Sequence, residues 1–212
     1  MDYTSPLVIG FLASFFLLAV LSMTAFVKLS VVFMIIRNAM GLQHVPSNAV
    51  LMVLAFFLAL FISLPTINAA VGAIQDTDIK LESPADFVAL WNIGIAPFQI
   101  FLERNIDEAQ SLFFTDIANE LWEGSGLVAT PESFIIQVPS FLVTELTEAF
   151  EIGFLLYLPF VAIDLAVTGI LMALGMQMVQ PNIIAVPFKL LIFVMVDGWA
   201  KLVSGLVVTY LG

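Results

Sequence analysis

An uninterrupted apolar run near the N-terminus constrains the fold of this chain more than any other feature. No charged residue occurs from Pro6 to Val27, and beyond Lys28 the apolar sequence resumes as far as Ile36. A helix that crosses the hydrocarbon core of a bilayer needs roughly 20 apolar residues, so this run is long enough to span. No positive charge precedes it, which argues against a cleaved signal peptide. We therefore interpret it as a retained membrane helix.

The composition extends this conclusion to the whole chain. Of the 212 residues, 61% are hydrophobic and 11% are charged, whereas soluble domains have about 45–50% apolar and about 25% charged residues. The absence of cysteine excludes disulfides and thiolate metal sites, and a single histidine, His44, is a poor basis for catalysis. Six Lys and Arg residues are too few for a nucleic-acid surface. We expect an integral membrane protein that is not an enzyme, with no metal, no cofactor and no nucleic-acid partner.

Four hydrophobic segments predict an all-α fold of membrane-type helical hairpins. After the first segment, a polar turn containing Gly41 and Pro46 leads into an apolar helix that starts near Ala49 and is kinked or broken at Pro65. Two more apolar stretches, about 134–179 and 183–211, are separated by a short link and should form an antiparallel hairpin. The predicted domains are an N-terminal hairpin over 1–75, an acidic region over 76–133 and a C-terminal hairpin over 134–212.

The acidic region differs in character from its surroundings. Residues 76–132 contain eleven Asp and Glu residues against Lys80 and Arg104, a net charge of −9. Aromatic and aliphatic residues recur among them at spacings near three and four, which indicates amphipathic helices. The positive charges of Lys28 and Arg37 place the first turn in the cytoplasm by the positive-inside rule. The acidic region is therefore predicted to be small, helical and periplasmic.

Charged residues also occur where lipid would reject them. Glu145, Glu148 and Glu151 follow one another at three-residue spacing, and Asp164 and Lys189 lie inside long apolar stretches. Each such group costs roughly 2.5–3.5 kcal/mol at mid-bilayer. Three interpretations remain open at this point: a proton or ion path, pairing between helices or subunits, or solvation at the membrane edge. For Glu148 we favour solvation at the edge.

Several blocks of sequence resemble the SctR/FliP family. The blocks are Phe26–Gly41, continuing into Val45–Asn48, then Leu158–Leu165, Leu171–Met176 and Pro187–Trp199. Together the resemblance covers nearly the whole chain except residues 76–132. The turn from Gln43 to Asn48 and the lack of a cleavable signal peptide favour the injectisome form over the flagellar form.

This resemblance implies a core, pore-forming subunit of the type III secretion export gate. Such a subunit passes unfolded secreted proteins across the bacterial inner membrane. The resemblance also implies a homo-oligomer of five copies, assembled with SctS/FliQ-like and SctT/FliR-like subunits and with SctU/FlhB-like and SctV/FlhA-like components. The protein would be multi-pass by sequence, yet the assembled gate would be raised toward the periplasm, so that protein surrounds the apolar helices.

The resemblance also assigns roles to individual residues. Glu145 and Lys189 match positions that lie at subunit contacts, and we group Asp164 with them as inter-subunit charges. Met176, Gln177 and Met178 match a methionine-rich loop that closes the pore as a gasket. Gln177 departs from the flagellar pattern, which has methionine there, so a complete methionine seal does not carry over. The alternative function is a small ion-coupled transporter that uses Asp164 as its coupling carboxylate.

Overall fold

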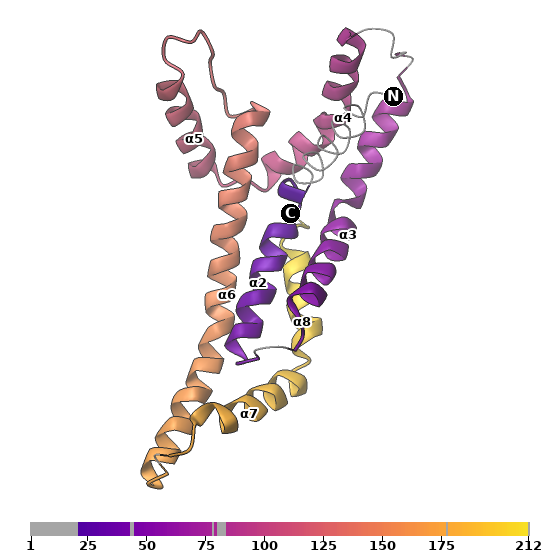
Figure 1. Ribbon diagram of the computed structural model, residues 1–212. Coiled ribbons are helices and arrows are strands. Elements are labelled where there is room, and N and C mark those ends of the chain that lie inside the picture. The colour runs from indigo at the N-terminus through magenta and orange to yellow at the C-terminus, as the bar shows by residue number, and fades with distance from the viewer. Residues whose placement is uncertain (1–20, 43–44, 78, 80–83, 177, 212) are drawn as a thin grey trace, which may run out of the picture. The chain divides into compact units, whose positions relative to one another are not determined.

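The computed structural model describes residues 21–42, 45–77, 79, 84–176 and 178–211, and within these ranges the chain is helical with no strand (Figure 1). The helices are α2 (Phe26–Ala39), α3 (Asn48–Gln75), α4 (Pro84–Arg104), α5 (Glu108–Leu121), α6 (Phe134–Ala173), α7 (Pro181–Met195) and α8 (Gly198–Val208). The predicted all-α fold is confirmed. Most of the first apolar run lies outside the described residues.

The predicted number of hydrophobic segments is not confirmed. Two of the described helices, α3 and α6, are long and apolar enough to cross a membrane. A third span arises only if α7 and α8 together count as one, and these two helices are bent by 62°. The stretch 183–211 is therefore two helices rather than the single one expected.

The helix ends follow the local sequence. Helix α2 stops before Gly41, whose φ of 74° lies in the left-handed region that favours glycine. Helix α5 begins after Asp107, whose side chain accepts hydrogen bonds from the N–H groups of Ala109 and Gln110. Helix α3 continues through Pro65, so the break expected there is absent, although proline removes one hydrogen bond of the ladder.

The chain divides into two compact units. The first unit comprises Met1–Val27 and Ala59–Glu145, and the second comprises Lys28–Leu58 and Leu146–Gly212. The boundaries between the units fall within α3 and α6 and just after the start of α2. The three-domain division expected from sequence stays a prediction.

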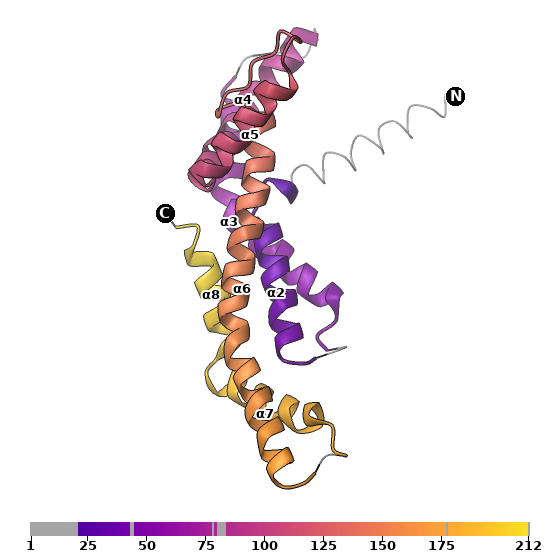
Figure 2. The same cartoon turned by 90° about the vertical axis from the view of Figure 1, so that its left-hand side faces the viewer.

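The first unit has two small cores around α4, α5 and the start of α6. Leu102 of α4 packs with Phe141 of α6 and with Met23. Ala118 of α5 packs with Ile136 of α6, and α5 lies beside the first turns of α6 (Figure 2). The loop between α5 and α6 is held by Asn119, which bonds both the N–H and the C=O of Ala129. These contacts order the segment that the sequence predicted to be a helical acidic region.

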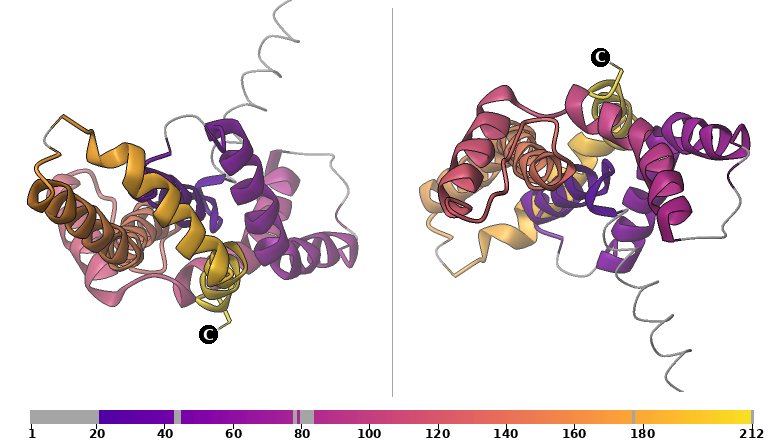
Figure 3. Two further views of the ribbon diagram at one scale, coloured as in Figure 1. Left: turned by 90° about the horizontal axis from the view of Figure 1, so that it is seen from below. Right: turned by 90° about the horizontal axis from the view of Figure 1, so that it is seen from above.

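The second unit is built around an aromatic cluster where α7 turns into α8. The ring of Trp199 packs edge-on against Phe193 at 5.4 Å between centroids and against Phe33 of α2 at 6.2 Å. Seen from below, α7 extends from the end of α6 to the start of α8 (Figure 3). A Cβ atom on Gly198 would lie 2.4 Å from the Phe193 ring, so the turn requires glycine. Asp197, just before it, has a left-handed φ of 59°.

Candidate functional site

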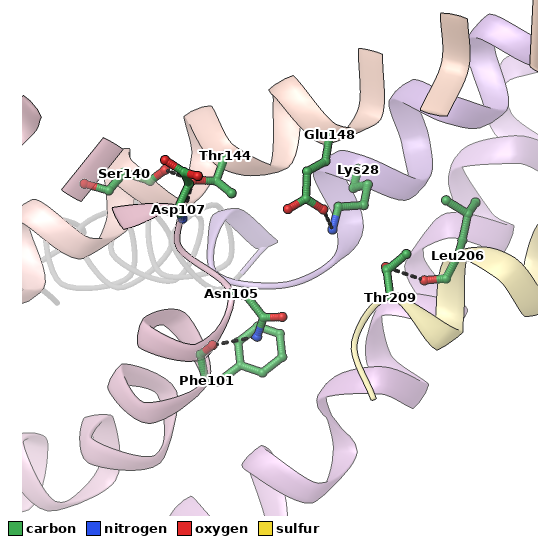
Figure 4. Close-up of polar contacts among 9 residues, drawn as sticks. All are labelled: Lys28, Phe101, Asn105, Asp107, Ser140, Thr144, Glu148, Leu206 and Thr209. Atoms are coloured by element: carbon green, nitrogen blue, oxygen red, sulfur yellow. Dashed lines mark hydrogen bonds and ion pairs between the residues drawn. The ribbon is translucent and has the colours of Figure 1, made fainter. Parts of the chain in front are cut away.

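The second unit contains a buried lysine that sequence reasoning did not assign to a site. The Lys28 ammonium lies 2.7 Å from a carboxylate oxygen of Glu148, and the side chains are 2% and 43% exposed (Figure 4). The Lys28 ammonium also lies over the ring of Tyr210, 4.2 Å from its centroid. Glu148 was expected to be solvated at the membrane edge, and it is paired instead. One signal was available: a lysine within an apolar helix needs a partner.

A second ion pair joins α6 and α7. The Lys189 ammonium lies 2.6 Å from Oδ2 of Asp164 and donates a second hydrogen bond of 2.9 Å to the carbonyl of Ala39, at the end of α2. Lys189 thereby connects three helices and neutralises Asp164. Three interpretations of the charged residues in apolar helices were open from the sequence. For Asp164 and Lys189, pairing between helices describes what is seen within one chain. Their expected contacts with other subunits stay predictions.

Glu145 and Glu151 have different environments from Glu148. Glu145 is completely buried, at the end of the first unit, whereas Glu151 is exposed. The three-residue spacing of these glutamates therefore does not give them one environment. The role of Glu145 as a contact with another subunit stays a prediction.

The loop between α6 and α7 presents methionine at its surface. Helix α6 ends at Ala173, and Gly175 turns the chain with a φ of 73°. Met178 is 99% exposed and Met176 is 42% exposed, while Gln177 lies outside the described residues. Exposed methionines are flexible apolar groups that can pack against varied partners. The loop is thus available for contacts beyond the chain itself.

Helix α6 exposes much of its apolar surface. Only 11% of its most apolar stretch is buried. Its large exposed side chains include Phe150, Phe154, Leu155, Leu158, Leu165 and Ile170. Apolar patches of this extent mark surfaces that lipid or other proteins cover.

No metal centre is found in the part of the chain that the structure describes. No group of three His, Cys, Asp or Glu side chains there could hold a metal ion. His44 lies outside the described residues. The described residues offer packing surfaces and buried ion pairs.

Comparisons with known proteins match nearly the whole chain. The model of the "FliP family" matches residues 9–206. The chain is 47% identical to "Probable translocation protein y4yL" of Sinorhizobium fredii, covering 91% of this chain and 87% of the relative. It is 42% identical to "Yop proteins translocation protein R" of Yersinia pestis, covering 89% and 88%. It is 41% identical to "Flagellar biosynthetic protein FliP" of Cereibacter sphaeroides, covering 91% of this chain and 62% of that relative.

Proposed function

Because the chain belongs to the FliP family, we propose that it is a pore-forming core subunit of a type III secretion export gate. In this role it passes unfolded protein substrates across the bacterial inner membrane and has no enzymatic activity. The observation that carries the proposal is the match over residues 9–206, together with relatives whose names describe them as translocation proteins. The injectisome form is favoured because the two relatives named as translocation proteins align with this chain over most of both sequences.

Assembly with other subunits accounts for the exposed apolar surface. We infer five copies of the chain, joined by SctS/FliQ-like and SctT/FliR-like subunits and by SctU/FlhB-like and SctV/FlhA-like components. The apolar face of α6 would then be covered by neighbouring helices, as in a protein core.

The exposed loop of Met176 and Met178 is the proposed pore gasket, with Gln177 between them. Methionine side chains from several copies would meet at the axis of a ring and exclude ions. Their flexibility would let the seal part when a polypeptide enters and close again behind it. The nearly complete exposure of Met178 and the partial exposure of Met176 in the isolated chain support this arrangement.

The pairing of Asp164 with Lys189 argues against the alternative function, an ion-coupled transporter that uses Asp164 as its coupling carboxylate. An ion-coupling carboxylate must release and bind its ion, whereas Asp164 already has an ammonium partner at 2.6 Å. A size and partner analysis of the native, detergent-extracted complex tests the proposal. The export gate should appear as a ring-shaped assembly containing several copies of the chain and the smaller subunits. A monomer that moves a small solute in liposomes would contradict it.

A further inference from the structure

The first unit contains an acidic cavity that the proposed gate does not use. It has a volume of about 220 Å³ and lies where the end of α4, the start of α5 and the start of α6 meet. Its polar lining consists of three glutamates, Glu103, Glu108 and Glu132, with Ser111 and Gln137. Drug-sized ligands occupy pockets of about 300–1,000 Å³. This cavity is therefore the right size for one side chain or a comparably small group.

Gln137 is the feature that points to a ligand. The residue is 3% exposed, and its Oε1 atom has no hydrogen-bond partner in the described part of the chain. A buried amide oxygen normally accepts a hydrogen bond, and leaving it without a donor costs free energy. The missing group is therefore a donor, and Gln137 borders the cavity through which that donor could enter.

The three lining glutamates are exposed, and their combined negative charge attracts a cation. Glu103 lies in the last turn of α4, where the helix dipole makes a negative charge unfavourable. None of Glu103, Glu108 and Glu132 forms an ion pair with another described residue. The pKa of Glu132 is lowered by hydrogen bonds from its backbone and from Thr130, so this carboxylate is ionised at neutral pH. Glu108 alone has a local role, because it lies in the favourable first turn of α5.

We propose that this cavity receives an arginine side chain from a different protein of the same assembly. A guanidinium group carries five N–H donors in a planar fork, so it can serve the Gln137 oxygen and the carboxylates together. A metal ion fits less well, since no three acidic side chains among the described residues converge closely enough to hold one. A second copy presenting the same region is disfavoured, because residues 76–132 carry a net charge of −9 and would repel each other. The inference rests on the proposed function only in requiring that the chain works in an assembly.

Photocrosslinking in the assembled complex tests this proposal. A photoreactive amino acid at Ser111, a lining residue without charge, should form an adduct with another protein, within a few residues of an arginine. The double variant Glu103→Gln with Glu132→Gln should lower the adduct yield about tenfold or more, as expected for lost charge-assisted hydrogen bonds. Glu120→Gln is the matched control, because Glu120 is exposed on α5 and does not line the cavity. It should leave the yield unchanged.

The outcomes separate this inference from the proposed function. An intact complex without an adduct means that water fills the cavity, which overturns the inference and leaves the gate standing. An adduct with a second copy of the chain, or at a site without a basic residue, also overturns it. So does an equal yield in the double variant and the Glu120→Gln control. If no multi-subunit complex can be isolated, the proposed function fails and the inference falls with it. Proteolysis resistance of the purified full chain checks that each variant is folded.

Discussion

Asparagine in place of Asp164 should destabilise the protein more than methionine in place of its partner Lys189. Lys189 is 5% exposed and Asp164 is 38% exposed. Asp164→Asn leaves a buried ammonium group without its counter-charge, and breaking a buried pair in this way costs about 3–5 kcal/mol. Because solvent reaches Asp164 and screens the pair, we expect a loss of about 2–3 kcal/mol.

The Lys189→Met substitution removes the buried charge itself. An apolar chain of similar length then occupies the space, and the partly exposed carboxylate of Asp164 can be hydrated. The carbonyl of Ala39 loses one donor, which costs about 1 kcal/mol. The two single substitutions should therefore differ by about 1–2 kcal/mol, although they break the same ion pair.

Equilibrium unfolding of the purified full chain in mixed micelles measures both losses. Tryptophan fluorescence reports on the second unit when Trp91 and Trp122 of the first unit are replaced by phenylalanine, because the remaining Trp199 packs against Phe33 and Phe193. Asp197→Asn is a matched control, since Asp197 is exposed and asparagine tolerates its left-handed conformation. A Lys189→Met variant that is as unstable as Asp164→Asn, or less stable, would refute the argument from burial.

A charge swap separates contacts within one chain from contacts between subunits. Lys189→Glu places a second carboxylate beside Asp164 and should abolish assembly of the complex, measured as the yield of native complex. Adding Asp164→Lys restores an opposite pair in the same chain and should recover the yield. Recovery by Glu145→Lys instead would show that Lys189 meets a neighbouring subunit.

Two further predictions concern the bend and the loop. Gly198→Ala should lower the free energy of unfolding by about 1–3 kcal/mol, because the new methyl group would lie 2.4 Å from an aromatic ring. Thermal unfolding measures this loss. The control is Gly205→Ala on the same helix, where the space is open, and this substitution should be neutral or slightly stabilising. Met176→Ala combined with Met178→Ala should raise ion leakage through the closed complex in planar bilayers, and unchanged conductance would mean that these side chains only pack.

The sequence predicted most helices because their signals are local. The apolar run of α3 and the stop at Gly41 can each be recognised from a few neighbouring residues. The break between α7 and α8 was missed because apolar residues continue on both sides of it. The dipeptide of Asp197 and Gly198 was the available signal, since Asp–Gly is typical of a turn. Because this dipeptide lies within a long apolar stretch, it was not interpreted as a turn.

The partners of the buried charges could not be predicted in the same way. Lys28 and Glu148 are separated by 120 positions in the chain. Spacing places Glu145, Glu148 and Glu151 on one side of a helix, but it does not say which of them meets a lysine. That choice depends on how α2 and α6 pack in the second unit, and packing is a property of the folded chain. Lys189 and Asp164 were identified as important, whereas their pairing became visible only in the structure.

The length of α6 decides how its surface must be covered. The helix has 40 residues, which corresponds to about 60 Å at about 1.5 Å per residue. The hydrocarbon core of a bilayer is about 30 Å thick. Large exposed apolar side chains occur from Ile135 near one end to Met172 near the other. One membrane crossing therefore leaves nearly half of this apolar surface outside lipid unless the helix is strongly tilted. Water would make that exposure unfavourable, so protein must cover it, as a subunit of a larger assembly requires.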